Sequence, residues 1–179
     1  MSEATRCGAS STGDGYLASI TDALDRTTTF GYTNRCLTSV TTPLGQTSTA
    51  TCNGAGQRLS VTDPLGHTTN FTWSNDDLAA ITDALGQAES WTYDNMDRVA
   101  SHTDRRNRTT TYSYDALGRP SSATLPGAGG TLTASYDAGN RLMALSDSLS
   151  GTLSWSYDGF DQVTQANGPQ GSIVYGYDA

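Results

Sequence analysis

The 179-residue chain is acidic, with 18 Asp and Glu against 10 basic residues and a formal net charge of −8 at pH 7. This charge repels nucleic-acid phosphates and anionic lipids, so we expect neither nucleic acid nor a membrane surface as a partner. No apolar stretch is long enough for membrane insertion, and the N-terminal residues lack the apolar segment of a Sec-type signal peptide.

Composition favours an all-β fold. Gly, Thr, Ser, Asp and Tyr are abundant, whereas the helix formers Glu and Lys are scarce. This is the chemistry of strands and turns. A hydrophobic content of 35% is low for a compact globule and suits a sheet with one dry face.

The chain repeats one phrase every 20 to 22 residues. Its first marker is the Asp of a Thr-Asp step, which another residue replaces in some copies. In successive copies this position holds Asp22, Thr42, Asp63, Asp83, Asp104, Leu125, Asp147 and Asn167. Its second marker is the Asp of a Tyr-Asp step, which is also replaced in some copies. In successive copies this position holds Thr33, Asn53, Ser74, Asp94, Asp115, Asp137, Asp158 and Asp178. Recurrence at such a period indicates a repeat architecture.

The repeat register also predicts the domain organisation. About eight copies fill residues 13–179, and residues 1–12 fit the back half of a truncated copy. The last copy breaks off in the middle of its motif at Tyr177-Asp178, and no atypical capping repeat is visible. We therefore expect a piece of a longer array.

Each copy is predicted to be a β-hairpin. In Thr62-Asp63-Pro64-Leu65-Gly66, Asp, Pro and Gly occupy the positions that they prefer in a type I turn. Glycine there accepts the positive φ with which the chain enters the next strand; the corresponding residues of two other copies are Gly45 and Gly86. The segment Tyr114-Asp115-Ala116-Leu117-Gly118-Arg119 repeats this turn at the opposite edge, which gives a long antiparallel meander.

The strand before each Tyr-Asp step alternates between aromatic and hydroxyl side chains. The pairs Phe71 and Trp73, Trp91 and Tyr93, Tyr112 and Tyr114, Trp155 and Tyr157, and Tyr175 and Tyr177 each lie on one face. We expect ladders of aromatic cross-strand neighbours, with Thr and Ser on the other face. The other strand places Leu78 and Ile81 three apart, so a bulge or a strong twist is expected in every copy, with curvature as its consequence.

Copy six departs from the pattern. The segment from Pro120 to Gly130 replaces the Thr-Asp turn with a looser stretch that contains two prolines. Because proline weakens a strand ladder, we expect a wider loop or a kink here. The repeat resumes at Tyr136-Asp137, so no domain boundary is predicted.

The three cysteines, Cys7, Cys36 and Cys52, lack the spacing of a zinc site. Cys36 and Cys52 flank one predicted hairpin and can approach each other. We nevertheless favour free thiols in the place of ordinary repeat residues. Cys52 stands where other copies have an aromatic residue, which favours a small buried hydrophobe.

These markers resemble the YD-repeat, or Rhs-repeat, family, whose copies look like YDxxGRLxxxTDxxGxxTxYxYD. The resemblance covers nearly the whole chain. Members include Rhs polymorphic toxins, the C component of toxin complexes and teneurins. It implies a curved, spiralling β-sheet strip that closes, in toxin members, into a hollow shell around a C-terminal toxin. A strip of this length is too short to enclose a toxin alone.

No constellation of residues points to catalysis or to a cofactor. Asp63-Pro64-Leu65-Gly66 is similar to the self-cleavage phrase of Rhs toxins, but it occupies the ordinary turn position. The basic run from Asp104 to Arg108 falls in the same position, where a solvated loop is favoured over a phosphate site. Calcium binding would need a nine-residue period, which is absent, and His67 and His102 have no catalytic partners nearby in sequence.

The predicted function is therefore structural and non-enzymatic: a wall segment of an Rhs shell, without cofactor or metal. Its inner face would carry Tyr, Trp and Leu, and its outer face Thr, Ser, Asp and Arg. Its partners would be further repeats of the parent chain, other copies at open sheet edges, or an enclosed toxin. The resemblance implies a secreted or cell-surface protein, in toxin members often exported by contact-dependent or type VI routes. The alternative is an extracellular adhesive module that recognises protein or glycan.

Overall fold

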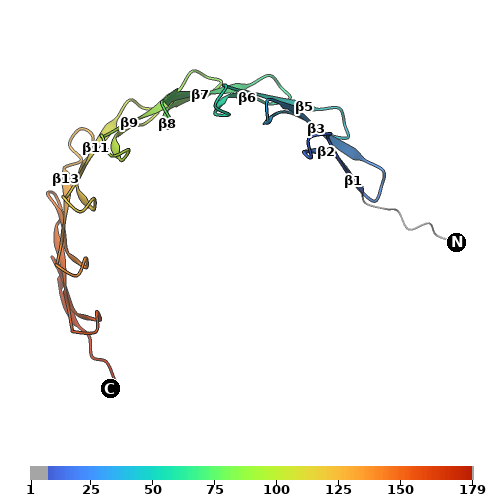
Figure 1. Cartoon of the computed structure of the whole chain (residues 1–179). Helices are drawn as coiled ribbons and strands as arrows, with labels where there is room; N and C mark the ends of the chain where they lie inside the picture. Colours follow the sequence, from blue (N-terminus) through green and yellow to red (C-terminus); the bar gives the residue numbers. More distant parts are fainter. Residues whose placement is uncertain (1–7, 179) are drawn as a thin grey trace. The chain divides into compact units, whose positions relative to one another are not determined.

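The computed structural model describes residues 8–178. These residues form 17 β-strands and no helix, so the described part of the chain has no helix that could cross a membrane. The chain divides between Ala88 and Glu89 into two compact units (Figure 1). Cys7 and the other residues before Gly8 lie outside the described part.

The first unit is a meander in which each strand pairs antiparallel with the next. Its strands are β1 (Gly8–Ser11), β2 (Leu17–Thr21), β3 (Thr27–Thr33), β4 (Cys36–Thr41), β5 (Thr47–Cys52), β6 (Arg58–Thr62), β7 (Thr68–Ser74) and β8 (Asp77–Thr82).

The second unit continues the same pattern from β9 to β17. Its strands are β9 (Ala88–Tyr93), β10 (Val99–Thr103), β11 (Thr109–Tyr114), β12 (Pro120–Thr124), β13 (Thr131–Tyr136), β14 (Leu142–Asp147), β15 (Gly151–Tyr157), β16 (Val163–Gly168) and β17 (Gly171–Val174). The predicted all-β fold of antiparallel hairpin repeats is confirmed.

Three-residue hairpin loops join most strands, at both edges. In the Asp63 turn, Gly66 N–H donates to Asp63 O (3.0 Å) and Asp63 N–H to His67 O (3.0 Å). Gly66 has a φ of +89°, as the type I turn followed by a left-handed residue requires. Where glycine is absent from this position, Asp25, Asp97, Asn107, Asn140 or Asp161 adopts the positive φ. Asn and Asp tolerate this conformation better than most residues.

A register shift occurs in every strand pair joined at the Tyr-Asp edge. In β7–β8, Trp73 pairs with Leu78 and Thr72 with Ala80, so Ala79 is the extra residue. This bulge puts Leu78 on the face of Ile81, which pairs with Phe71. The predicted bulge in every copy is confirmed, and because bulges bend strands, each unit taken by itself is a bent strip (Figure 1).

The two faces of each unit differ as the alternation predicts. One carries the aromatic residues, and the other carries cross-strand hydroxyl pairs such as Thr62–Thr68 (2.8 Å) and Thr103–Thr109 (2.8 Å). Neither face is covered within a unit. Cys36, 8% exposed, is the one hydrophobic side chain that is buried among residues 8–178, so this single layer has no conventional core.

The cross-strand neighbours of the aromatic residues differ from the expectation. Aromatic residues recur on every second strand, so the neighbour of Phe71 is Ile81 and the neighbour of Tyr112 is Ala123, not another ring. The expectation of direct aromatic cross-strand ladders was therefore wrong, because one copy spans two strands.

Where the second marker is Thr33 or Ser74 instead of Asp, the loop is shorter. Thr33 pairs directly with Cys36, and Ser74 with Asp77, across two-residue turns in which Asn34 and Asn75 have positive φ. In copy six, Leu125 N–H donates to Gly130 O (2.9 Å), which closes the wider loop that the two prolines predict.

We predict that substitutions at Gly66 destabilise the turn through the positive φ of this residue and not through steric contact of the new side chain. A Cβ at Gly66 would meet no atom within 4 Å, but its φ is +89°. Gly66→Val should lower the free energy of unfolding by ~1–2 kcal/mol, the cost of a left-handed residue, whereas Gly66→Asn should cost clearly less, as Asn107 already holds this turn position. Thermal unfolding followed by circular dichroism measures both, and equal melting temperatures for the two variants would contradict the prediction.

Candidate functional site

The aspartates of the two repeat markers cap the turns. In the Thr-Asp turns, the carboxylate accepts the N–H two residues on, at 2.8–2.9 Å. The residues placed in this way are Asp22, Asp63, Asp83, Asp104 and Asp147. In the Tyr-Asp turns, Asp94, Asp115, Asp137 and Asp158 do the same at 2.8–2.9 Å. Asp178 lies beyond the last strand and is exposed.

The glycine and tyrosine markers also have defined places. Positive φ angles of 77–89° occur at Gly45, Gly66, Gly86 and Gly118. Tyr93 pairs with Val99 across the bulge. The other marker tyrosines donate their hydroxyls to backbone carbonyls of the preceding strand; these are Tyr114, Tyr136, Tyr157 and Tyr177.

These tyrosines close the open ends of hairpins, a contact that we call the clasp. The β14–β15 ladder ends at Ala144 and Ser154, and beyond it Tyr157 Oη donates to Leu142 O (2.7 Å). Equivalent bonds join Tyr114 to Val99 O (2.9 Å) and Tyr136 to Pro120 O (2.9 Å). In β6–β7, an indole serves the same purpose, because Trp73 Nε1 donates to Arg58 O (2.8 Å).

In the second unit, an arginine joins the clasp to the Asp turn beside it at three tyrosines: Tyr114, Tyr136 and Tyr157. Arg119 Nε donates to Asp115 Oδ2 (2.7 Å), and the guanidinium lies 4.4 Å from the Tyr136 ring centroid. Its Nη1 also donates to Asn140 Oδ1 (2.8 Å), in the turn of the next copy. One arginine therefore links two successive copies through an ion pair, a cation–π contact and a hydrogen bond.

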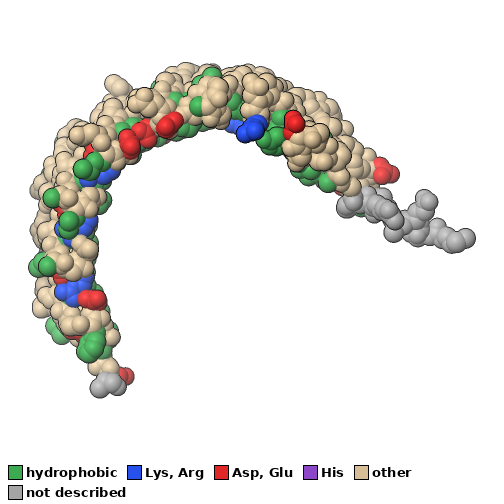
Figure 2. All heavy atoms as spheres, in the orientation of Figure 1, with side chains coloured by type: hydrophobic (Ala, Val, Ile, Leu, Met, Phe, Trp, Pro, Cys, Tyr) green, Lys and Arg blue, Asp and Glu red, His purple; other side chains and the backbone are tan. Residues whose placement is uncertain are grey.

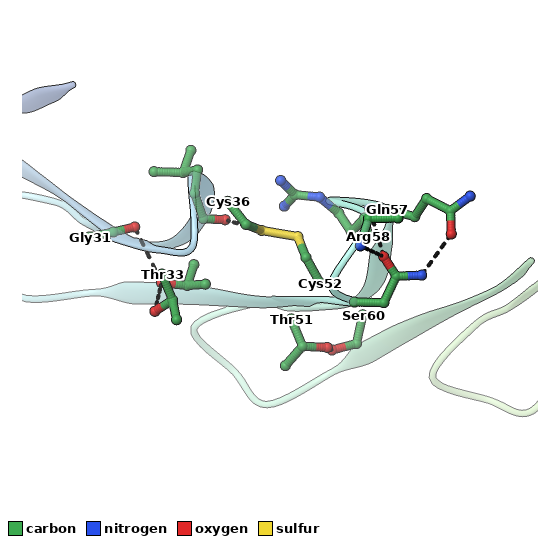
Figure 3. Close-up of a disulfide and its surroundings, with 12 residues drawn as sticks. Gly31, Thr33, Cys36, Thr51, Cys52, Gln57, Arg58 and Ser60 are labelled. Carbon is green, nitrogen blue, oxygen red and sulfur yellow. Dashed lines mark hydrogen bonds between the residues drawn. A yellow bond between two sulfur atoms is a disulfide. The ribbon is translucent and has the colours of Figure 1, made fainter. Parts of the chain in front are cut away.

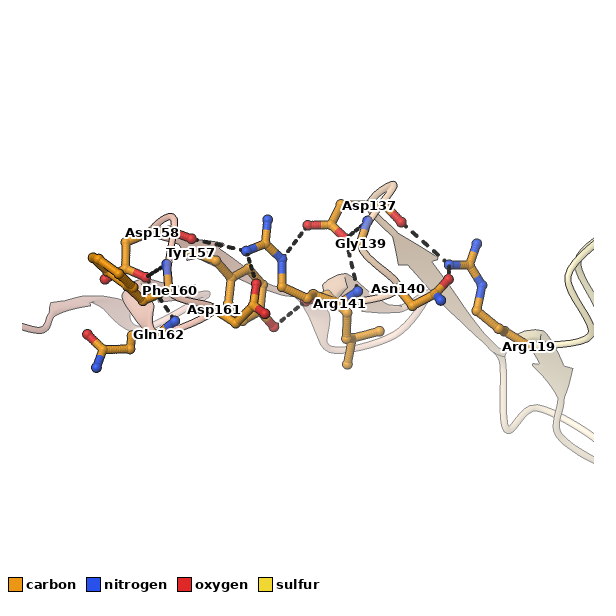
Figure 4. A network of polar contacts seen from close by, with 11 residues as sticks. Arg119, Asp137, Gly139, Asn140, Arg141, Tyr157, Asp158, Phe160, Asp161 and Gln162 are labelled. Carbon is orange, nitrogen blue, oxygen red and sulfur yellow. Dashed lines mark hydrogen bonds and ion pairs between the residues drawn. The ribbon is translucent and has the colours of Figure 1, made fainter.

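The next arginine repeats these contacts (Figure 4). Arg141 Nε donates to Asp137 Oδ2 (2.6 Å), and its Nη1 donates to Asp161 Oδ1 (2.7 Å) and Asp158 O (3.1 Å). Its guanidinium lies 4.8 Å from the Tyr157 ring. Charged side chains consequently gather along one side of the second unit (Figure 2).

This arrangement corrects one part of the predicted faces. Arginine was assigned to the hydroxyl face, but Arg98, Arg119 and Arg141 lie over tyrosine rings on the aromatic face. The reason is that each turn carboxylate holds its arginine side-on, and the flat guanidinium then covers the neighbouring ring. The signal was present in the sequence as an Arg four residues after Asp with a Tyr in the next copy.

The turn contacts also lower the pKa of several of these aspartates. Hydrogen bonds from Arg108, first its side chain and then its backbone, lower the pKa of Asp104 to about 2. The side chains of Arg26 and Arg98 lower the pKa of Asp22 and Asp94 in the same way. The pKa of Asp115 and Asp137 is lowered chiefly by backbone N–H donors. For Asp147, the Ser150 hydroxyl is the main cause of the lowered pKa.

The phrase Asp63-Pro64-Leu65-Gly66 has the contacts of a turn. Asp63 accepts the backbone N–H of Leu65 (2.9 Å) and of His67 (2.9 Å), and its Oδ2 lies 2.8 Å from His67 Nδ1. The His67 side chain chiefly lowers the pKa of Asp63. A lowered pKa and a complete set of turn bonds describe a structural carboxylate.

The remaining sequence candidates are held by structural contacts too. Arg105 Nε donates to Glu89 (2.8 Å), and Arg108 pairs with Asp104. His102 stacks on Trp91 with ring centroids 5.2 Å apart, and its Nε2 lies 3.7 Å from Glu89. Residues 8–178 contain no group of three or more His, Cys, Asp or Glu placed to hold a metal ion.

The preference for free thiols at Cys36 and Cys52 was wrong, because the structure joins them in a disulfide with Cα atoms 6.4 Å apart (Figure 3). Extension of the β4–β5 register places the two residues opposite each other, beyond the last pair, Ser39 and Thr49. The expectation that Cys52 replaces an aromatic residue agrees with the register, since Cys52 pairs with Arg58 as Trp73 pairs with Leu78.

An apolar hollow of about 390 Å³ lies on the aromatic face of the second unit. Ala134 occupies there the strand position that Tyr112 and Trp155 fill in other copies. The other side chains around it are aliphatic, aromatic or hydroxyl groups, among them Leu132, Leu145 and Ser122. This lining contains no carboxylate, imidazole, thiol or guanidinium group.

Comparison with known proteins gives the family. The model described as RHS Repeat matches residues 33–68, 73–109, 97–132 and 136–173, well over half of the chain. The chain therefore belongs to the RHS repeat family. The comparison with curated proteins finds no match.

Solved toxin-complex structures share the fold. The "Photorhabdus luminescens Tc holotoxin pore, Mutation TccC3-D651A" is 16% identical with a TM-score of 0.60, over 89% of this chain and 12% of that chain. "TcdB2-TccC3 without hypervariable C-terminal region" is 15% identical with a TM-score of 0.64, over 98% and 11%. "TcdB2-TccC3" is 15% identical with a TM-score of 0.61, over 90% and 12%. This chain thus spans about a ninth of their length.

We predict that the clasp contributes measurably to stability. Tyr136→Phe keeps the ring under Arg119 but removes the hydroxyl that donates to Pro120 O, so the free energy of unfolding should fall by about 1 kcal/mol. Arg119→Lys should also destabilise, because an ammonium cannot make the bidentate and stacked contacts together. Urea unfolding measures both, with Arg106→Lys in an exposed turn position as control. Unchanged stability in both clasp variants would contradict this role.

The pKa of Asp104 predicts a specific acid dependence. Its folded pKa of about 2 lies below the ~3.9 of an unfolded aspartate. The stabilisation is therefore fully present above the unfolded value and is lost as the pH falls through the folded value. Asp104→Asn should melt below the wild type at pH 7, and the difference should shrink as the pH falls from about 4 and vanish below pH 2. Asp178→Asn is the control, and a difference of the same size at pH 7 and at pH 2 would refute the assignment.

Proposed function

We propose that this chain is a non-enzymatic wall segment of an Rhs-type shell, which in a longer parent protein encloses a C-terminal toxin. The single-layer construction is the observation that carries the proposal. A sheet with one buried hydrophobic side chain among its described residues is built to present two broad faces and not to surround a reactive site.

The turns supply surfaces for neighbouring parts of such a wall. Leu24, Leu44, Leu65 and Leu85 recur in successive Thr-Asp turns of the first unit and are 71–87% exposed. A regular row of exposed leucines indicates a surface that another element covers. In a spiralling strip, that element is another stretch of repeats of the same parent chain or a second copy.

The disulfide supports an oxidising location. Disulfides persist mainly in secreted, periplasmic or cell-surface proteins. We therefore place the parent protein outside the cytoplasm or at the cell surface, in agreement with the export that the family resemblance implies. An enclosed toxin would face the apolar side of the strip in this arrangement.

We predict that isolated chains associate through the leucine row. Light scattering should show a mass that rises with protein concentration, and replacement of Leu24, Leu44, Leu65 and Leu85 by Ser should reduce the association at least severalfold. Met96→Ser with Leu117→Ser, in turns of the opposite edge, is the matched control. A wild-type chain that stays monomeric at high concentration would count against this contact.

Enclosure is tested in the parent protein. A domain that follows the repeats should resist protease in the intact parent and be digested when residues 13–179 are deleted. Equal digestion in both would refute the enclosing role. Binding of a protein or glycan by the intact repeats, without any protected domain, would instead favour the adhesive alternative.

A further inference from the structure

The Cys36–Cys52 disulfide occupies the position at which the clasp hydrogen bond lies in other hairpins. Beyond the last ladder pair, five other hairpins are closed by Trp73, Tyr114, Tyr136, Tyr157 and Tyr177. In β4–β5, the residue in this register position is Cys52, and its partner Cys36 comes directly before Leu37, which pairs with Tyr32 as Leu142 pairs with Tyr136. A covalent bond has replaced the tyrosine clasp in this one copy.

No described neighbouring contact holds the ends of β4 and β5 together if the disulfide is reduced. The preceding two-residue turn, Asn34 and Arg35, has no marker Asp to hold an arginine over the strand ends. Past the cysteines, the β4–β5 pair keeps three ladder pairs, from Ser39–Thr49 to Thr41–Thr47. Thiol groups are weak hydrogen-bond donors, so two reduced cysteines cannot reproduce the bond of a tyrosine hydroxyl.

A reductant has access to the bond. A hollow of about 310 Å³ adjoins the disulfide and is lined by both cysteines together with Thr33, Asn34 and Asn53. Cys36 is 8% exposed, whereas Cys52 is half-buried, so Cys52 is the more exposed residue of the two. The hydroxyl and amide groups of Thr33, Asn34 and Asn53 in this lining can hydrogen-bond a small hydrophilic thiol of the glutathione class.

We propose that the Cys36–Cys52 disulfide is a reducible clasp, a redox-sensitive seam at which the first unit loosens in a reducing compartment. A thiolate attacks Cys52 Sγ and forms a mixed disulfide, and Cys36 leaves as a thiolate that takes up a proton. A second thiol then attacks the mixed disulfide, releases Cys52 and leaves as part of the oxidised reductant. Two reductant thiols thus become one disulfide, and the two cysteines become thiols.

The consequence is local. The three remaining ladder pairs and the Thr42 turn still join β4 to β5, so their ends at the Tyr-Asp edge separate while the rest of the unit stays paired. On the wall function proposed above, this creates a seam that is closed during export and opens after entry into a reducing cytosol. The seam itself does not depend on whether the parent protein encloses anything.

Hydrogen exchange read by mass spectrometry tests the seam in the full 179-residue chain carrying Cys7→Ser, which prevents disulfide exchange with Cys7. Addition of dithiothreitol should accelerate exchange of the amides in 36–41 and 47–52 on the order of tenfold, and leave β13 and β14 unchanged. Thiol titration before and after reduction verifies the redox state. Free thiols before reduction, unchanged exchange after it, or equal acceleration throughout both units would each overturn the proposal.

A rescue variant separates the clasp from a general effect of cysteine loss. In Cys36→Ser with Cys52→Tyr, the tyrosine hydroxyl regains the position from which its counterparts bond to a backbone carbonyl. This variant should keep the slow exchange of 47–52 in dithiothreitol, whereas Cys36→Ser with Cys52→Ser should exchange as fast as the reduced chain. Equal exchange in the two variants would show that the position does not act as a clasp.

Discussion

The contact on which the second unit depends is the one between an arginine, the turn carboxylate of its own copy and the tyrosine of the next. A single-layer sheet has no interior in which side chains from distant parts of the chain can meet. Cohesion between successive hairpins therefore comes from the backbone ladder and from what happens at its edges. At the Tyr-Asp edge the bulge splays the strands, and the guanidinium of Arg119 or Arg141 fills the space, pairs with Asp115 or Asp137 and covers the next ring.

Such edge contacts suit a wall. Each copy contacts only its neighbours, so copies can be added without redesign of a common core. The cost is that both faces and the turn leucines remain uncovered within each unit.

The clasp also shows how one structural need is met by different chemistry. A tyrosine hydroxyl closes most hairpins of the second unit, an indole N–H closes β6–β7, and a disulfide closes β4–β5. All three occupy the same register position, because the strand ends diverge there in every copy. A hydrogen-bonded clasp does not react with thiols, whereas the disulfide clasp does. The residue at position 52 therefore decides whether this hairpin stays closed under reducing conditions.

The sequence alone determined the hairpin period, the two faces, the turns and the bulge, because each depends on residues within one copy. Asp63, Pro64 and Gly66 specify a turn wherever they stand together, and the spacing of Leu78 and Ile81 requires an extra residue in the strand. The tertiary structure decided which side chains of neighbouring strands meet: Arg119 lies over Tyr136, and Cys36 is bonded to Cys52. These contacts depend on how far the strands diverge beyond the bulge, and that distance is a property of the assembled sheet.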